Sequence, residues 1–395
     1  MPRLEVIEPA DAADVAAKLK WANAEGLAIA VQGAGTKQDW GAPASRADVV
    51  LSTLRLNAPV DHVAGDLVAT VPAGAALDAV NDALRREKQW LPLDPGVSHL
   101  ATIGGVIATN DSGPRRHRYG TPRDLIIGIE IALADGRTAK AGGRVVKNVA
   151  GYDLSKLLCG SLGSLAVITS ATFKLSPVAP ASYTVVATVA DAASLGALAL
   201  ALAAAPLSPS TIEIQSPPHR LLIRFETSPH SAEQQTAAAI RVCAALGAAT
   251  ETLSGEAEAG AWRAHERHVS SAGGTVVKLA IRPTDVADML VRVESLAARH
   301  GVESAVVGRA ALGVIFVRLG GDLSQLSAIV TDLRREAVAR HGSAVLLSAP
   351  PDLKAQLGAW GPIGDAAPIM RAVKSQFDPR GTLNPGRGSW EPGQP

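Results

Sequence analysis

Hydrophobic and polar positions follow strand and helix periods in a repeated order along the second half of the chain. The first set of segments predicts β-α-β-β-α-β, with strands at 183–189, 211–215, 220–226 and 248–253 and helices at 192–205 and 231–246. The second set predicts the same order, with strands at 276–282, 303–307, 312–318 and 344–347 and helices at 284–300 and 323–341. We therefore predict an α+β region of two ferredoxin-like units side by side. An α/β region of this length without an internal repeat is the alternative.

The first part of the chain has a different pattern. From Leu4 to Pro177, short Val/Ile-rich strands alternate with glycine-rich turns, and helical periods occur at 11–25 and 75–87. Asp11 can cap the first of these helices because its carboxylate can accept hydrogen bonds from the first turn. This part therefore predicts a second α+β unit with its own core.

Prolines separate these regions. The segment SPVAP at 176–180 places two prolines in a span that neither a helix nor a central strand accepts easily. We therefore expect a first domain at 1–177, a second domain at 178–350 and a C-terminal segment at 351–395. That last segment contains a helix at 367–377 and a tail of turn-forming residues, DPRGTLNPGR.

Composition and charge exclude several functions. The chain has 395 residues, with 38 Lys and Arg against 37 Asp and Glu, so it lacks the broad positive field that nucleic-acid binding needs. The two cysteines, Cys159 and Cys243, stand in predicted helices as free thiols rather than a disulfide framework. The N-terminus is acidic where a signal peptide would be basic and apolar. We therefore expect a cytoplasmic protein without a nucleic-acid partner.

The first candidate for chemistry is the turn VQGAGT at 31–36, which follows a predicted strand. Two glycines expose successive backbone N–H groups that can hold a pyrophosphate, with Thr36 and Lys37 adding a hydroxyl and a positive charge. A Rossmann fingerprint would need a third glycine where Gln38 stands and a helix after it, so the NAD interpretation is weak. A purely structural turn is the alternative.

The second candidate is the segment at 92–120, PLDPGVSHLATIGGVIATNDSGPRRHRYG. Thr102, Gly104 and Gly105 form another turn rich in N–H donors, and small or polar residues keep the following backbone accessible. Two separated phosphate cradles suit a dinucleotide held in an extended form. The basic run at 115–118 is too short for a nucleic-acid surface and fits a solvated loop or a subunit contact.

The third segment, 123–175, predicts a hairpin at Asp135-Gly136, a helix at 152–159 and a glycine turn before a strand that begins at Leu165. Together with FDPRGTLNPGR, the three segments resemble the FAD domain of the vanillyl-alcohol-oxidase family, also called the PCMH type. The resemblance covers the chain to about Leu175 plus the tail. Within that family, KNVAGYDLSKL and the short length are most similar to the FAD-binding E subunits of bacterial glycolate oxidases.

The resemblance implies a two-subdomain FAD-binding domain, an α+β cap domain and a C-terminal segment that returns to the FAD domain. It also implies that nineteen residues bind FAD, as pyrophosphate contacts, flavin-side contacts, backbone donors and a closing tail residue. These are Gly33, Ala34, Gly35, Thr36, Lys37, Thr102, Ile103, Gly104, Gly105, Thr109, Asn110, Ser112, Gly113, Tyr119, Asp124, Gly163, Val167, Ile168 and Asn384. Family members with covalent flavin place a His or Cys near these turns. Here Thr36, Lys37 and arginines stand there instead, which predicts noncovalent FAD.

The residues for catalysis stay unassigned at this stage. Oxidation of a 2-hydroxy acid needs a base for the hydroxyl proton and a cation or metal for the carboxylate. The HxGDGNxH segment of related dehydrogenases is missing from this chain. His265 and His268 would share a helix face, but Arg263 and Arg267 beside them disfavour a metal, so we expect none. Four basic residues on predicted strands could hold a carboxylate, namely Arg220, Arg224, Lys278 and Arg282.

Three hypotheses follow. The resemblance favours an FAD-binding subunit of a complex that oxidises glycolate to glyoxylate, with a catalytic flavoprotein and an iron-sulfur protein as partners. Such partners could bring it to the periphery of the inner membrane. The alternatives are a self-contained FAD-dependent dehydrogenase for a small 2-hydroxy acid and a structural assembly subunit without flavin.

Overall fold

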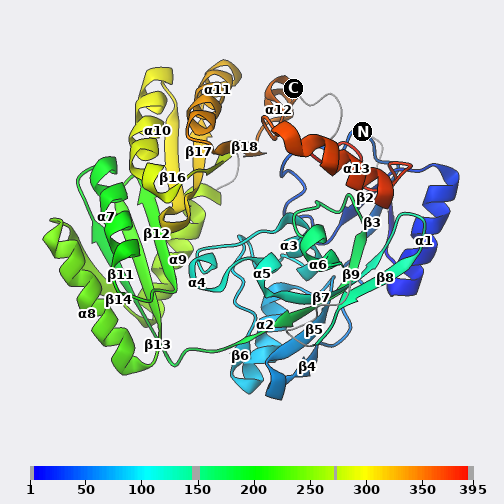
Figure 1. Cartoon of the computed structure of the whole chain (residues 1–395), viewed down its shortest axis with the longest axis horizontal. Helices are drawn as coiled ribbons and strands as arrows, with labels where there is room; N and C mark the ends of the chain where they lie inside the picture. The colour runs from blue at the N-terminus through cyan, green and yellow to red at the C-terminus, as the bar shows by residue number, and fades with distance from the viewer. Residues whose placement is uncertain (1–3, 145–151, 271–273, 390–395) are drawn as a thin grey trace.

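The first half of the chain contains a three-stranded and a five-stranded sheet (Figure 1). This is a computed structural model, and it describes residues 4–144, 152–270 and 274–389. The smaller sheet is parallel, in the order β1-β3-β2, and is formed by β1 (Glu5–Ile7), β2 (Ile29–Gln32) and β3 (Val49–Ser52). Helix α1 (Ala12–Glu25) connects β1 to β2 along the chain. Asp11 caps this helix by accepting a hydrogen bond from the Asp14 N–H, as predicted.

The larger sheet of this half is antiparallel, in the order β4-β5-β9-β7-β8. Its strands are β4 (Asp61–Val63), β5 (Val68–Pro72), β7 (Ile126–Ala132), β8 (Thr138–Gly142) and β9 (Val167–Lys174). The predicted hairpin joins β7 to β8, where Gly136 takes the left-handed conformation. Helices α2 (Leu77–Leu84) and α3 (Ile103–Thr109) pack on the sheet, and Phe173 is buried in the core that they share.

Short elements connect this half to the rest of the chain. Helices α4 (Arg116–Tyr119) and α5 (Pro122–Leu125) follow α3, and α6 (Leu154–Leu158) is shorter than the predicted helix. The KNVAG part of the third motif falls within residues 145–151, outside the described residues. Near the predicted boundary, β10 (Ser176–Pro177) pairs with β6 (Gln89–Trp90).

The second half has the element order that the periodicity predicts. The first unit comprises β11 (Ala181–Thr188), α7 (Ala192–Ala204), β12 (Thr211–Ser216), β13 (Arg220–Thr227), α8 (Pro229–Ala245) and β14 (Ala249–Leu253). The second comprises β15 (Thr275–Ala280), α10 (Val286–His300), β16 (Glu303–Arg309), β17 (Val314–Gly320), α11 (Leu323–Ala339) and β18 (Ser343–Ser348). Strand β12 pairs with β16, so both units form one sheet ordered β14-β11-β13-β12-β16-β17-β15-β18.

The two faces of this eight-stranded sheet differ in polarity. Ile212, Ile223, Phe225 and Val277 belong to the apolar core that the sheet shares with α7, α10 and α11. The alternate positions carry charged side chains, which are Glu213, Arg224, Glu226, Lys278 and Arg309. Helix α9 (Gly255–Ser270), which the repeat pattern did not include, packs on this charged face (Figure 1). The charged face is therefore the one turned toward the first half of the chain.

The C-terminal segment returns to the first half. After α12 (Pro351–Leu357) and α13 (Ala367–Phe377), the Ile29 N–H donates to the Thr382 carbonyl at 2.7 Å, and Leu383 forms a parallel bridge with Ile29. The tail thus extends the edge of β2, immediately before the first glycine turn. Within the described ranges, no helix is both long and apolar enough to cross a membrane.

Candidate functional site

The first glycine turn presents a row of free backbone donors. It leaves β2 at Gly33, and Gly35 takes a positive φ of 76° that an L side chain would strain. Among the hydrogen bonds of the described residues, none uses the N–H groups of residues 33–37 as a donor. Five successive N–H groups without a protein acceptor make an anion-binding concavity. The turn can therefore hold a phosphate or another anion.

The second segment packs directly against this turn. A Cβ at Gly33 would lie 2.0 Å from the Thr102 hydroxyl oxygen, so only glycine allows the approach. Thr102 caps α3 by accepting from the Gly105 N–H at 3.4 Å. The N–H groups of Ile103 and Gly104 donate to Ala75 and Ala73, and Ile103 is fully buried. These last two residues therefore shape the segment and do not offer the free donors that the sequence suggested.

The third segment and the C-terminal tail contact each other beside the first glycine turn. The Asn384 side chain accepts from the Val31 N–H at 3.1 Å and donates to the Leu162 carbonyl at 2.8 Å. Gly163 has a positive φ of 69°, and a Cβ there would lie 2.8 Å from the Asn384 amide nitrogen. Asn384 thus pins the first turn to the third segment, a structural role that the sequence did not suggest.

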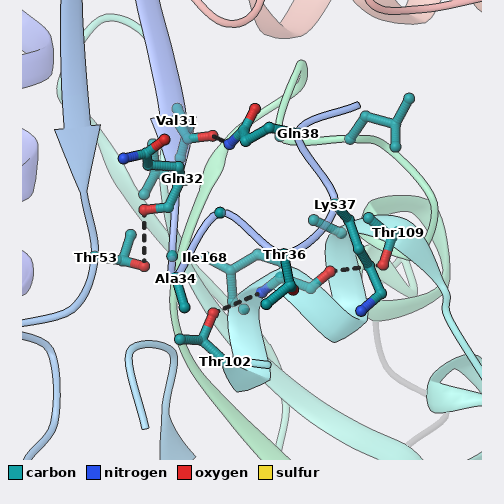
Figure 2. A pocket seen from close by; sticks show the side chains of 18 of the residues that line it. Val31, Gln32, Ala34, Thr36, Lys37, Gln38, Thr53, Thr102, Thr109 and Ile168 are labelled. Atoms are coloured by element: carbon teal, nitrogen blue, oxygen red, sulfur yellow. Dashed lines mark hydrogen bonds between the residues drawn. The ribbon is translucent and has the colours of Figure 1, made fainter. Parts of the chain in front are cut away.

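These segments enclose one cavity of about 670 Å³, counting its mouth (Figure 2). Twelve of the nineteen predicted residues line it, namely Gly33, Ala34, Gly35, Thr36, Lys37, Thr102, Gly104, Gly105, Thr109, Gly163, Val167 and Ile168. Sequence reasoning missed Gln32, Thr53 and Arg387, which also line it. Arg387 donates to the Gln38 side chain at 2.6 Å and to the Trp40 carbonyl at 3.0 Å, so the NPGR ending of the tail could have indicated it.

Lys37 does not direct its charge into this cavity. Its ammonium lies 3.1 Å from the Asp111 carboxylate and donates to the Gly96 carbonyl at 3.3 Å. Both side chains of the ion pair are more than 90% buried. In this structure the Lys37 ammonium therefore joins two segments of the protein, and its role toward a pyrophosphate stays a prediction.

Several predicted residues lie away from the cavity wall. Asn110 ends α3 and accepts from the Arg123 N–H, while Tyr119 packs edge-on against Trp90. Asp124 forms a capping box with Thr121, and its predicted flavin-side contact stays a prediction. Ser112 and Gly113 line a second cavity, which lies at the junction of the two halves.

The junction cavity has about 1770 Å³ of space, counting its mouth, and shares Thr36 and Lys37 with the first cavity. Apolar side chains from both halves line it, namely Trp40, Val97, Trp262, Val307, Phe316 and Leu347. Because the two cavities meet at the first glycine turn, a ligand in one would lie next to a ligand in the other.

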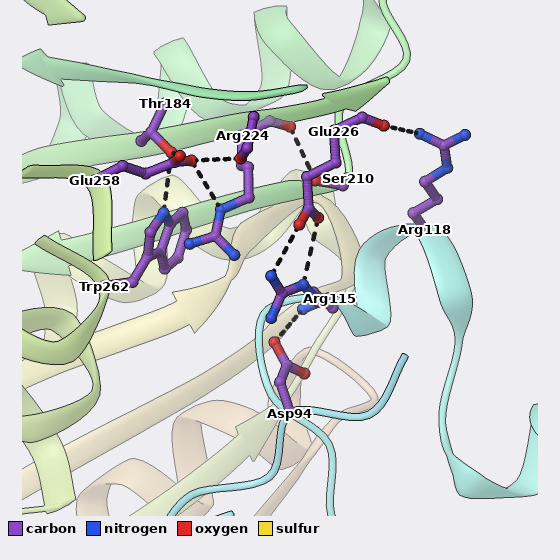
Figure 3. Close-up of polar contacts among 10 residues, drawn as sticks. Asp94, Arg115, Arg118, Thr184, Ser210, Arg224, Glu226, Glu258 and Trp262 are labelled. Carbon is purple, nitrogen blue, oxygen red and sulfur yellow. Dashed lines mark hydrogen bonds and ion pairs between the residues drawn. The ribbon is translucent and has the colours of Figure 1, made fainter. Parts of the chain in front are cut away.

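Ion pairs surround the junction cavity (Figure 3). Arg115 donates to Glu226 at 2.8 Å across the two halves, and Arg224 lies 3.2 Å from Glu258. Burial raises the pKa of Asp94 to about 6, although Arg115 lowers it through its charge and its N–H. Burial lowers the pKa of Arg224 to about 10, with nearby Arg115 adding to the effect. Most arginine charge at this cavity is therefore already compensated.

The other predicted cations have distinct environments. Arg282 pairs with Asp285 at 2.8 Å, and Arg220 is exposed at the start of β13. Lys278 has no carboxylate within ion-pair distance among the described residues. Its ammonium lies 6.0 Å from the Phe316 ring, and burial together with Arg116 lowers its pKa. Arg116 and Lys278 line a small recess that adjoins the junction cavity.

The two neighbouring histidines of α9 have separate partners. His265 contacts Glu213 at 3.1 Å, whereas His268 contacts the Ser216 carbonyl at 3.2 Å. In the parts of the chain that the structure describes, no group of three metal-ligating side chains occurs.

Comparison with known proteins assigns the family. Residues 4–142 match the FAD binding domain family, and residues 363–387 match the C-terminal domain of FAD linked oxidases. The chain is 30% identical to a D-lactate dehydrogenase of Archaeoglobus fulgidus over 97% of this chain and 90% of that protein. This chain belongs to the FAD-linked oxidases. This FAD-linked oxidase is also 30% identical to glycolate oxidase subunit GlcE of Escherichia coli, over 91% of this chain and 92% of that protein.

Solved structures agree on the fold. This chain superimposes on the structure of p-cresol methylhydroxylase with a TM-score of 0.78 at 16% sequence identity. The superposition covers 98% of this chain and 88% of the p-cresol methylhydroxylase chain. The predicted flavoprotein family and its α+β fold are therefore confirmed. The match of residues 4–142 to the FAD binding domain family also supports FAD as the cofactor, while the two predicted phosphate cradles stay a prediction.

Proposed function

We propose that the chain binds FAD noncovalently in the first cavity, with the N–H groups of residues 33–37 around the pyrophosphate. The observation that carries this proposal is that five successive residues with unpaired N–H groups line a cavity built from three distant segments. The cavity suits such a ligand, because the first glycine turn lines it with backbone N–H groups and Gly35 adds no side chain there. Bound FAD would supply a two-electron acceptor at the junction cavity.

Noncovalent attachment is supported by the wall of the first cavity. Its described lining residues include no His, Cys or Tyr that could bond to a flavin ring. We therefore expect that acid precipitation of the yellow protein leaves all flavin in the supernatant. Flavin that stays with the denatured chain would contradict this part of the proposal.

We propose a small 2-hydroxy acid, with glycolate as the leading candidate, as the compound oxidised at the junction cavity. The relatives named D-lactate dehydrogenase and glycolate oxidase subunit support this substrate class. Lys278 and Arg116 could hold the carboxylate, because neither has a carboxylate partner among the described residues. Oxidation of glycolate would give glyoxylate and reduced flavin.

We further propose that the chain acts as one subunit of a complex, beside a catalytic flavoprotein and an iron-sulfur protein that accept the electrons. The likeness to GlcE over nearly its whole length supports this arrangement. A self-contained dehydrogenase is the second candidate, favoured by the free cations Lys278 and Arg116.

The deciding experiment compares the isolated chain with the chain purified together with its partners. Stoichiometric FAD with glycolate-dependent dye reduction only in the complex would support the subunit. Brisk turnover by the isolated chain would favour the self-contained dehydrogenase. A colourless protein that still assembles the complex would instead support a structural subunit.

A further inference from the structure

A histidine and a glutamate are buried together in the wall of the junction cavity. His265, on α9, is 3% exposed, and Glu213, on β12, is 1% exposed. Their side chains meet at 3.1 Å between the His265 Nε2 and the Glu213 Oε2. Both residues line the junction cavity, and His265 is the one histidine among its described lining residues.

The surroundings define which ring nitrogen carries the hydrogen. Glu213 also lies 3.4 Å from the Arg309 guanidinium, so its carboxylate acts as an acceptor. The His265 Nε2 must then donate to Glu213, which leaves the Nδ1 lone pair as an acceptor in the neutral ring. Within the described part of the chain, this buried Nδ1 has no hydrogen-bond partner.

The imidazole packs against Trp262, which has two further partners of its own. The Trp262 ring packs edge-on against it with centroids 5.6 Å apart, and the Trp262 indole N–H donates to the Thr184 hydroxyl at 2.9 Å. The Arg224 guanidinium lies over the Trp262 ring, 4.1 Å from its centroid. An acceptor without a donor in so rigid and buried a site is costly unless a ligand supplies the hydrogen.

We propose that His265 is the proton acceptor of the junction cavity and that its Nδ1 binds the hydroxyl hydrogen of a 2-hydroxy acid. Glu213 is the positioning residue that fixes the ring tautomer. This inference rests on the proposed function, and it supplies the base that the sequence did not reveal. In the reaction the O–H bond breaks and its proton passes to Nδ1. FAD, where bound, would supply the two-electron acceptor for the hydrogen on the same carbon, and the carbon–oxygen single bond would become a carbonyl.

Two substitutions separate binding from proton transfer. His265→Gln can still donate to Glu213 but has no acceptor at the Nδ1 position. His265→Asn keeps a hydrogen-bonding amide near the Nδ1 position but is not a base. His300→Gln is the matched control, because His300 forms a comparable pair with Asp332 at 3.0 Å between α10 and α11.

The first measurement is the rate of flavin reduction by glycolate or lactate in anaerobic rapid mixing, on holoprotein with its partners, after subtraction of the reduction shown by the partner flavoprotein alone. A positioned general base contributes about 100-fold or more to such a rate. We therefore expect His265→Gln and His265→Asn to lose about 100-fold, while His300→Gln keeps the wild-type rate.

The second measurement needs no turnover. On protein reduced beforehand with dithionite, calorimetry gives the dissociation constants of lactate and of propionate, which lacks the hydroxyl. We expect the wild type to prefer lactate about tenfold, His265→Gln to lose the preference and His265→Asn to keep part of it. Wild-type reduction rates and an unchanged lactate preference in folded, FAD-loaded His265→Gln would overturn the inference. Failure of the wild type to bind FAD would instead refute the proposed function itself.

Discussion

Single residues decide how closely the segments of the first cavity can approach. Gly33 and Thr102 stand 69 positions apart in the sequence, and their contact leaves no room for a Cβ. The glycine-rich motifs could therefore be recognised from the sequence as a cofactor site. The roles of Asn384, Asp111 and Arg387 could not, because each depends on partners that are distant in the chain.

Gly33→Ala should weaken FAD binding at least about tenfold, since the added methyl group forces the first turn away from Thr102. Fluorescence titration of the apoprotein with FAD measures the effect. Gly65→Ala serves as the control, because nothing lies within 4 Å of a Cβ at Gly65 and its φ is not positive. Equal affinities for Gly33→Ala and the wild type would contradict the packing argument.

Asp94 should make stability depend on pH at the junction. Its folded pKa of about 6 lies above the ordinary value of 3.8, because burial disfavours the carboxylate. The folded state thus binds this proton more tightly than the unfolded state, so the stabilisation is complete below about pH 4 and is lost as the pH rises through 6. Asp94→Asn should therefore raise the Tm by about 2 °C at pH 7 and have no such effect at pH 4. Calorimetric scans of the wild type and Asp94→Asn between pH 4 and pH 7 measure this difference in Tm. A lower Tm of the variant at pH 7 would contradict the prediction.

At the scale of elements, hydrophobic periodicity predicted the β-α-β-β-α-β order of both units, because the outer face of the sheet is uniformly apolar. It did not reveal that β12 pairs with β16, since pairing between units depends on strand edges rather than on side-chain pattern. The charged inner face was visible only as isolated Glu and Arg residues in strands such as TIEIQS. Helix α9 covers that face and carries few apolar residues, so it lacked a strong helical period.

Arg309 links two elements that the sequence places far apart. From the end of β16 it donates to the carbonyls of Ser112 and Gly113, at 2.9 and 3.3 Å, just after α3. Arg309→Met should therefore destabilise the fold by about 3 kcal/mol, because Glu213 and two carbonyls lose a buried partner. Arg335→Met removes an exposed pair with Asp332 and should cost less than about 1 kcal/mol. Urea unfolding followed by tryptophan fluorescence measures the free energy of unfolding of both variants. Similar losses of stability would contradict the proposed stabilising role of Arg309.

At the scale of the whole molecule, the C-terminal tail completes the wall that the first forty residues begin. Asn384→Ala removes the side chain that joins Val31 to Leu162. We expect this variant to fold but to lose FAD about tenfold faster in gel filtration than the wild type. Ser375→Ala, at an exposed position of α13, is the control and should retain its flavin. Retention of FAD by Asn384→Ala would show that the tail is dispensable.

This closure has a consequence for biosynthesis. Thr382, Leu383 and Asn384, which contact β2, leave the ribosome only after the whole eight-stranded sheet has been translated. A nascent chain that has exposed only its first glycine turn thus displays unsatisfied amide groups with no enclosing pocket. Flavin should therefore enter only after Asn384 has been synthesised, and chains that terminate before it should accumulate without colour.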